Sequence, residues 1–271
     1  MIGLLMTIQM QSFPIPNIVM SEYRRLLISS KRIEDSLQNN NLIKLTTKEK
    51  HYITRVLRLR DDDQLAVIDG LGRLWNANLV NNDYLVLTTN AFNPIESSSR
   101  PEIQTCLAIV MPKYGMDDVI RMSCEIGIDI IQPLVSNRSV VTHLSSQRFS
   151  RWNVILNESV EQSERLWRPQ LRELICFSNW LEHSFQGMLV TIGTTRTDKA
   201  QPFELLLEKT STDVDEIWTA IGPEGGWTDD EIELAEKHHC INITMGNSIL
   251  RSSTAAVVST QIMSSWRTLN V

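Results

Sequence analysis

The sequence lacks the features that define several classes of protein. Its 271 residues include only four cysteines, and no two of them form a Cys-x-x-Cys pair. This scarcity argues against both a disulfide scaffold and a cysteine zinc site, and it favours free thiols in a reducing cytoplasm. The five histidines show no metal-ligand spacing with Asp, Glu or Cys, so we expect no metal.

The opening segment, residues 1–19, lacks a targeting signal. It is moderately apolar, but it has no basic n-region and contains two prolines, so it fits neither a secretory signal nor a membrane span. We expect a disordered extension there, or the product of an upstream start codon, and no membrane partner. The length of the chain, with 42% hydrophobic residues, favours two domains.

Positive charge is also scarce. The formal net charge is −6, whereas a typical nucleic-acid-binding domain is basic. The deficit is uneven: residues 1–100 hold twelve Lys and Arg against ten Asp and Glu, which leaves fourteen against twenty-two in the remainder. The overall charge therefore argues mildly against an RNA partner, and this argument is weakest for the N-terminal third.

The sequence pattern changes near residue 100. Short alternating or β-branched runs separated by Asp, Asn and Gly turns occupy residues 26–90, with one helix expected over 47–57, and they indicate a small β barrel or sandwich. A polar linker follows at 93–101. From residue 102 apolar runs alternate with helical patterns, which predicts an α/β domain with a parallel sheet. We expect strands over 103–110, 128–135, 171–176, 188–193, 216–221 and 241–245, and helices over 114–126, 146–167, 179–185, from 228 and over 252–266.

Two glycine-bearing loops stand out in this second part. Ile-Gly-Pro-Glu-Gly-Gly-Trp at 221–227 precedes a Thr228-Asp-Asp-Glu231 capping box, which predicts that a helix begins there. Met-Gly-Asn-Ser-Ile-Leu-Arg at 245–251 precedes the last helical pattern. Because the carboxyl ends of parallel strands share one edge of a sheet, the two loops can meet at a ligand site. Either loop alone suits an ordinary strand-to-helix turn, and Gly193 with residues 194–196 offers a third such loop.

The paired loops carry a resemblance. Gly-Pro-Glu-Gly-Gly-Trp followed by Gly-x-x-Ile-Leu-Arg-x-x-Thr-Ala resembles the RsmE family, SPOUT-class methyltransferases that use S-adenosylmethionine to methylate N3 of a uridine in 16S ribosomal RNA. Further likenesses are His-Tyr-Ile-x-x-Val-Leu-Arg-Leu at 51–59, Asp-Gly-x-Gly at 69–72, a block over 113–140 and, more loosely, Glu-Gln-Ser-x-Arg-x-x-x-Pro at 161–169. The likeness runs from about Met20 to the end of the sequence.

The resemblance implies an architecture and partners. It predicts a PUA-like RNA-binding β-barrel domain over 20–92 and a SPOUT methyltransferase domain over 102–271. The SPOUT domain would have a C-terminal trefoil knot within about residues 190–263, against the general rule that chains do not thread loops. It also implies S-adenosylmethionine as cofactor, the small ribosomal subunit as partner, and a homodimer.

The resemblance also implies site residues. Cofactor contacts are expected at Ile192, Gly193, Ile221, Gly222, Pro223, Glu224, Gly225, Met245, Gly246, Ile249, Leu250, Thr254 and Ala255. RNA contacts are expected at Arg24, Arg25, Arg55, Arg58, Arg138 and Arg165. The alternative for the N-terminal arginines is a solvated face, and for Arg165 an i,i+4 pair with Glu161.

Two residues are catalytic candidates. Uridine N3 must lose a proton and be presented unpaired in line with the methyl group, so groups that stabilise an anionic base are needed. Arg251 is the first candidate for this role, the alternative being a salt bridge to Glu224. Glu224 itself is a candidate for cofactor contact or proton removal, or it accepts backbone amides within its own turn.

One position departs from the family pattern. The family usually has Glu before the final Thr-Ala, where this sequence has Ser253. We expect Ser253 to cap the last helix. The departure keeps two alternatives open: another SPOUT enzyme that acts on transfer RNA or a ribose hydroxyl, and a non-catalytic RNA-binding or assembly protein.

Overall fold

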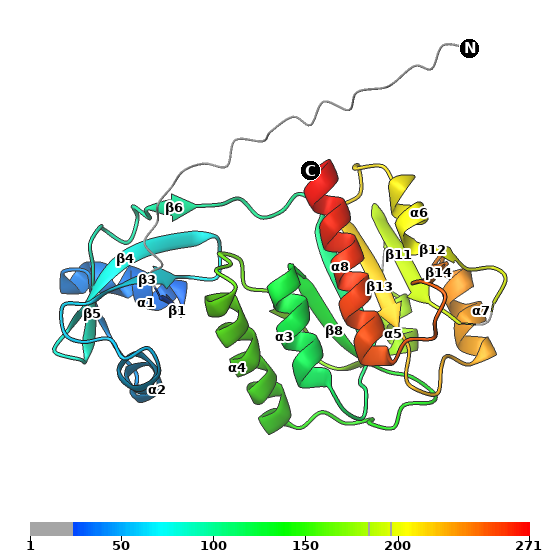
Figure 1. Ribbon diagram of the computed structural model, residues 1–271, viewed down its shortest axis with the longest axis horizontal. Coiled ribbons are helices and arrows are strands. Elements are labelled where there is room, and N and C mark those ends of the chain that lie inside the picture. The colour runs from blue at the N-terminus through cyan, green and yellow to red at the C-terminus, as the bar shows by residue number, and fades with distance from the viewer. Residues whose placement is uncertain (1–23, 184, 196) are drawn as a thin grey trace, which may run out of the picture.

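The computed structural model describes residues 24–183, 185–195 and 197–271 (Figure 1). The extension predicted over 1–19 lies outside these residues. An N-terminal β-rich part, coloured blue to cyan, adjoins a larger α/β part in which helices cover a sheet (Figure 1). The change of pattern near residue 100 thus corresponds to a real change of architecture.

The N-terminal part is built on a six-stranded, mostly antiparallel sheet. Its strands are β1 (Arg25–Leu27), β2 (Leu42–Lys44), β3 (Gln64–Ile68), β4 (Arg73–Val80), β5 (Tyr84–Leu87) and β6 (Glu96–Ser97). Their order is β1-β3-β4-β5-β2, and β6 pairs with β4. Since β6 falls inside residues 93–101, the segment predicted as a polar linker also adds a short strand to this sheet.

Turns and helices of this part follow from local sequence. The Asp69 carboxylate accepts the backbone N–H groups of Leu71 and Arg73, which closes the β3–β4 turn. The helices are α1 (Ser30–Asp35), the 3-10 turn η1 (Ser36–Asn39), α2 (Thr47–His51) and its π-helical continuation η2 (Tyr52–Val56). A reciprocal capping box between Thr46 and Glu49 starts α2. The helix predicted over 47–57 is therefore confirmed.

The second part contains an entirely parallel sheet of eight strands. The strands are β7 (Gln104–Val110), β8 (Ile130–Val135), β9 (Gln170–Leu171), β10 (Ile175–Cys176), β11 (Met188–Gly193), β12 (Gln201–Pro202), β13 (Glu216–Ile221) and β14 (Ile241–Thr244). The order is β10-β8-β7-β13-β11-β14-β12, with β9 beside β8. Strands buried on both faces read as continuous apolar runs, which is why the sequence predicted this sheet.

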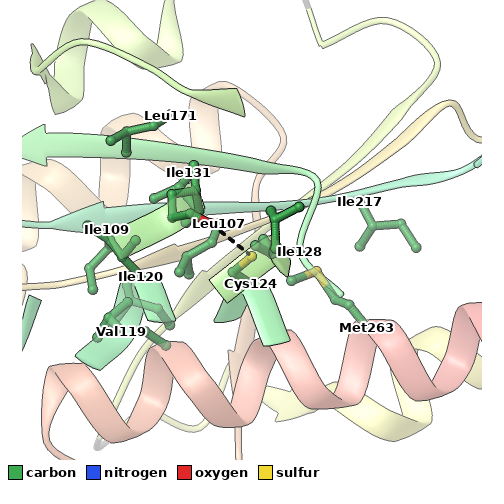
Figure 2. Packing of buried hydrophobic residues seen from close by; sticks show 14 of the residues in the cluster. Leu107, Ile109, Val119, Ile120, Cys124, Ile128, Ile131, Leu171, Ile217 and Met263 are labelled. Carbon is green, nitrogen blue, oxygen red and sulfur yellow. Dashed lines mark hydrogen bonds between the residues drawn. The ribbon is translucent and has the colours of Figure 1, made fainter. Parts of the chain in front are cut away.

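Helices cover both faces of the parallel sheet. They are α3 (Met116–Ile126), α4 (Ser146–Gln162), α5 (Phe177–Leu181), α6 (Phe203–Glu208), α7 (Asp229–Lys237) and α8 (Ser252–Asn270). Residues of α3, α4, α6 and α8 share one buried cluster, and those of α5 and α7 share another. Figure 2 shows the first cluster, where Val119, Ile120 and Cys124 of α3 and Met263 of α8 pack against the sheet.

Some predicted bounds were wrong for identifiable reasons. The helix expected over 146–167 ends at Gln162, because Glu164 has a left-handed φ of 59°. The strand expected over 171–176 is split into β9 and β10. Opposite the break lies Pro133, which has no N–H to donate, and the Gln132 side chain donates to Glu173 O at 2.6 Å instead. The short elements β12 and α6 were not predicted.

The arrangement around β14 bears on the predicted knot. This strand lies between β11 and β12, which are joined to each other by residues 194–200 and precede it in the sequence. From β14 the chain returns as α8 to pack on β7 and β13. A knot requires that a later segment of the chain pass through a loop formed by an earlier one, and the position of β14 between β11 and β12 is of this kind. The trefoil knot within residues 190–263 stays a prediction.

Among the described residues, no helix is both long enough and apolar enough to cross a membrane. All four cysteines are free thiols, and Cys106, Cys124 and Cys240 are buried. Burial raises the pKa of Cys124 to about 11 and that of Cys240 to about 12. These three thiols therefore act as small core residues.

Candidate functional site

The two glycine loops meet at the carboxyl edge of the parallel sheet. They follow β13 and β14, and the strand that lies between these two, β11, ends at Gly193. Ser252 Oγ donates a hydrogen bond to Gly222 O at 2.8 Å, which ties the second loop to the first. Trp227 Nε1 donates to Gly193 O at 3.0 Å, which ties the first loop to the third. Three loops are therefore cross-linked around one site.

A cavity of about 370 Å³ lies between these loops. Its wall includes the apolar side chains of Ile221, Met245, Ile249 and Leu250 and the backbone of several glycines. Thr194 also lines it, is only 6% exposed, and has a hydroxyl without a hydrogen-bond partner among the residues that the structure describes. A cavity with both apolar and polar walls and an unpaired buried polar atom is typical of a small-molecule site.

Glycine is required at particular points of this cavity. A Cβ at Gly222 would lie 2.9 Å from the Trp227 indole and would displace it. Gly226 and Gly246 have φ of +69° and +81°, in the left-handed region that favours glycine. Apart from the adjacent residues, no heavy atom of the described chain lies within 4 Å of the Cβ position of either glycine, so both open onto space that a ligand can occupy.

Neighbouring loops hold the 221–227 loop in place. The Lys113 backbone N–H, from the loop after β7, donates to the Glu224 carboxylate at 2.9 Å. Arg138 Nη1, from the loop after β8, donates to Gly225 O at 3.0 Å and to Trp227 O at 3.1 Å. The Thr228–Glu231 capping box is also present and starts α7 at Asp229, as predicted. The loop is therefore rigid before any ligand binds.

Most of the predicted cofactor residues line this cavity. They are Gly193, Ile221, Gly222, Pro223, Gly225, Met245, Gly246, Ile249, Leu250 and Ala255. Ile192 is fully buried behind it, while Glu224 and Thr254 are exposed outside it. The prediction left out Thr194, Thr195, Gly226, Trp227, Ile232, Thr244, Asn247, Ser248 and Ser252, which also line the cavity. Trp227 belongs to the 221–227 motif, so the sequence could have predicted that it lines the cavity.

Arg251 lies at the mouth of this arrangement. It is the N-cap residue of α8, its side chain is exposed, and within the described residues it has no ion-pair partner. The alternative of a salt bridge to Glu224 is therefore not what the structure contains. Ser253 follows within the first turn of α8 and lies against Gly115 at the start of α3. A free guanidinium next to a ligand cavity is suited to hold an anion.

The six arginines predicted to contact RNA divide into groups. Arg24, Arg55 and Arg58 are exposed on the N-terminal part. Arg138 is engaged with the 221–227 loop and also lines the cavity.

Two of these assignments need correction. Arg165 is inside the fold, where it donates to Cys124 O and Ile128 O, both at 2.8 Å, and pairs with Asp129. Burial lowers its pKa. Arg25 has a side chain only 14% exposed and pairs with Glu164 at 3.0 Å. Both guanidiniums have structural partners, which removes the basis for assigning them to RNA phosphates.

A smaller cavity, of about 180 Å³, lies between the N-terminal part and α4. Glu161 lines it and accepts the Leu27 backbone N–H at 2.8 Å, which attaches β1 to α4. Burial raises the pKa of Glu161 to about 7, against the lowering effect of the Leu27 hydrogen bond. The predicted i,i+4 pair of Glu161 with Arg165 is absent, since both side chains have other partners.

Family models match both parts of the chain. Residues 99–264 match the RNA methyltransferase domain, and residues 45–88 match the RNA methyltransferase PUA domain. The first match alone spans more than half of the sequence. The second match lies within the β-rich part, and the first covers most of the α/β part.

Named relatives and solved structures match most of the length of this chain. The chain is 34% identical over 236 residues to the ribosomal RNA small subunit methyltransferase E of Synechocystis sp., covering 86% of this chain and 75% of the relative. It is 27% identical to that of Rickettsia conorii, covering 87% and 93%. A Legionella pneumophila protein in complex with S-adenosylmethionine has the same fold, with a TM-score of 0.77 at 21% identity over 90% of this chain and 97% of that one.

A second solved structure carries the name of the same enzyme. The ribosomal RNA small subunit methyltransferase E of Neisseria gonorrhoeae, bound to S-adenosyl methionine, matches with a TM-score of 0.70 at 24% identity, covering 83% of this chain and 91% of that one. The sequence match to the Synechocystis enzyme and the domain match over residues 99–264 decide the family. The chain belongs to the ribosomal RNA small subunit methyltransferase E family.

Proposed function

We propose that this protein transfers a methyl group from S-adenosylmethionine to N3 of a uridine in 16S ribosomal RNA, within the small ribosomal subunit. The observation that carries the proposal is the cavity at the carboxyl edge of the parallel sheet, closed by both halves of the motif through the Ser252–Gly222 hydrogen bond. The names of the relatives supply the class of substrate.

The residues around the cavity fit S-adenosylmethionine. Ile221, Met245 and Leu250 offer apolar contacts for an adenine ring, and backbone groups beside the glycines are open to its polar edge. The Thr194 hydroxyl is buried, has no partner within the described part of the chain, and would gain one from the ligand. When bound, this cofactor supplies an electrophilic methyl group on a sulfonium.

The remaining chemistry concerns the uridine. N3 carries a proton at neutral pH, so the base must be deprotonated before or during attack, and negative charge develops on the uracil oxygens. Arg251 is permanently protonated and free of an ion pair among the described residues, which suits it to stabilise that charge. Glu224 is a weaker candidate for proton removal, since its carboxylate already accepts the Lys113 N–H.

Substrate recognition would combine two surfaces. The exposed Arg24, Arg55 and Arg58 suit phosphate contact by the PUA-like part, in a chain whose net charge is −6. Weak overall attraction implies recognition of a preformed RNA shape over long-range steering. An assembled small subunit offers such a shape, and the protein would meet it in the cytoplasm.

A homodimer belongs to the same proposal, on the ground of family resemblance. Light scattering at several protein concentrations tests it. A mass equal to one chain at all concentrations would contradict it.

The decisive experiment offers labelled S-adenosylmethionine and three acceptors: small subunits that lack the modification, naked 16S RNA, and transfer RNA. We expect label on the subunits, at uridine N3, and little on the others. Label on transfer RNA alone would refute the substrate. In a parallel calorimetric titration, failure to bind S-adenosylmethionine at millimolar concentration would refute the enzyme and favour a non-catalytic RNA-binding protein.

A further inference from the structure

A second hollow, of about 540 Å³, lies beside the cofactor cavity at the start of α3. It is lined by Lys113 and Tyr114 from the loop after β7 and by Gln147, Arg148 and Arg151 from the start of α4. None of these residues was assigned a role from the sequence. Tyr114 is 76% exposed, so its ring is open to contact from outside the protein.

One cation lies over this ring, and a second lines the same hollow. Lys113 Nζ lies 5.2 Å from the centre of the Tyr114 ring, and Arg148 stacks over Trp152 at 5.1 Å. The acidic groups nearby are already paired: Asp117 with Arg151 at 2.6 Å, and Asp118 with Arg121 at 3.4 Å. Within the part of the chain that the structure describes, Lys113 and Arg148 have no acidic partner. The hollow therefore presents one exposed aromatic ring and two cations, Lys113 and Arg148, that have no ion pair among the described residues.

The hollow lies next to the cofactor cavity, and contacts between neighbouring residues connect the two. The Lys113 backbone donates to Glu224, whose neighbours Pro223 and Gly225 line the cofactor cavity. On the other side, a Cβ at Gly115 would lie 3.5 Å from Cβ of Ser253, which follows Arg251 by two positions. The N-terminus of α8, where Arg251 is the N-cap, thus lies between the hollow and the cofactor cavity.

We propose that Tyr114 stacks against an unpaired base of the RNA strand next to the methylated uridine, with Lys113 and Arg148 on its phosphates. The inference rests on the proposed RNA methylation. A uridine presented for attack at N3 must be unpaired, and where it lies in a single-stranded segment its neighbours in the strand are also unpaired and need a surface. Exposed aromatic rings beside Lys and Arg bind single-stranded RNA in this way, because every base has a face to stack.

The test measures RNA binding directly. A short fluorescein-labelled oligouridylate is titrated with wild-type protein and the variants Tyr114→Ala and Tyr114→Phe, followed by anisotropy. Phe92→Ala is the matched control, since Phe92 is 70% exposed but lies outside the hollow. We expect about tenfold weaker binding for Tyr114→Ala, near-wild-type binding for Tyr114→Phe, and no change for Phe92→Ala.

The cations are tested by salt dependence. Arg148→Gln should flatten the dependence of oligouridylate affinity on salt concentration, because one phosphate contact is lost. Lys209→Gln, which removes an exposed cation after α6 and outside the hollow, should leave the slope unchanged. Equal slopes for all three proteins would remove Arg148 from the surface.

Separate outcomes distinguish this inference from the proposed function. Wild-type protein that binds S-adenosylmethionine but not oligouridylate, or a Tyr114→Ala variant that binds the RNA as tightly as wild type, overturns the inference alone. Protein that binds neither ligand overturns both. If oligouridylate binds through Tyr114 but no methyl group is transferred, the RNA surface stands and the enzymatic proposal falls.

Discussion

Ser252 Oγ lies 2.8 Å from Gly222 O and joins two loops that are thirty positions apart in the sequence. One loop supplies Gly222 and Pro223 to the cavity wall, and the other supplies Met245 to Leu250. The hydrogen bond therefore sets the width of the cavity, although neither loop needs it to form its own turn.

Ser252→Ala should weaken S-adenosylmethionine binding by about five- to tenfold, because Gly222 O loses its donor and the loops separate. Calorimetric titration measures this change. Ser253→Ala is the matched control, since its side chain lies against Gly115 outside the cavity and its substitution should change affinity by less than about twofold. Equal affinities for both variants and wild type would show that the loops hold their spacing without the bond.

Arg251→Ala should reduce methyl transfer to small subunits by at least about tenfold, since a charge-stabilising group lowers the barrier by at least about 1.4 kcal/mol, which is a factor of ten in rate. Arg251 does not line the cofactor cavity, so S-adenosylmethionine affinity should be unchanged. Its exposure predicts an unaltered melting temperature. Arg251→Lys keeps the charge without the forked geometry and should retain partial activity; near-normal turnover of the alanine variant would remove Arg251 from the mechanism.

Asp129→Ala should destabilise the protein by about 3–5 kcal/mol, because it leaves two part-buried guanidiniums unpaired. The Asp129 side chain is 5% exposed and is bonded to Arg165, Arg267 and the Thr105 N–H. Denaturant unfolding measures the loss. Asp118→Ala, which removes an exposed partner of Arg121, should cost under about 1 kcal/mol; similar costs for both would contradict a buried network.

Glu161→Gln should make stability less sensitive to pH. The raised pKa of Glu161, about 7, means that the folded protein keeps this proton while the unfolded chain, near its ordinary value of 4.5, has lost it. The carboxyl group therefore favours folding most below pH 4.5, and that advantage is lost as pH rises through 7. Gln retains an oxygen that can accept the Leu27 N–H without acquiring a charge.

Melting temperatures of wild type and Glu161→Gln, measured at pH 5 and pH 8, test this. The melting temperature of the variant, relative to that of wild type, should be higher at pH 8 than at pH 5 by about 3–6 °C. Glu204→Gln, an exposed glutamate on α6, should track wild type. A Glu161 variant that also tracks wild type would show that this carboxyl group stays ionised in the fold.

Features that depend on local sequence were predictable. The capping boxes at Thr46 and Thr228, the glycine turns and the buried strands β7, β11 and β13 follow from residues that are neighbours in the chain. The cavity wall was largely predictable for the same reason, because its residues lie at the ends of these strands.

Partners of charged side chains were not predictable. Arg25 and Arg165 are residues of the type that binds RNA phosphates, but they form ion pairs with Glu164 and Asp129. Which acidic residue each arginine pairs with depends on how α4 packs against the rest of the fold. Tyr114 was missed for the converse reason. An aromatic residue before a helix usually packs inside, and only the packing of α3 against α4 shows that this ring stays outside.

The position of α8 in the sequence has a consequence for synthesis. This helix follows every strand of the sheet it covers, and it carries Arg251, Ser252 and the Arg267 that pairs with Asp129. Domains emerge from the ribosome in order, so the PUA-like part can fold while α8 is still inside the exit tunnel. A nascent chain therefore lacks a complete methyl-transfer site until α8 has emerged and packed on the sheet.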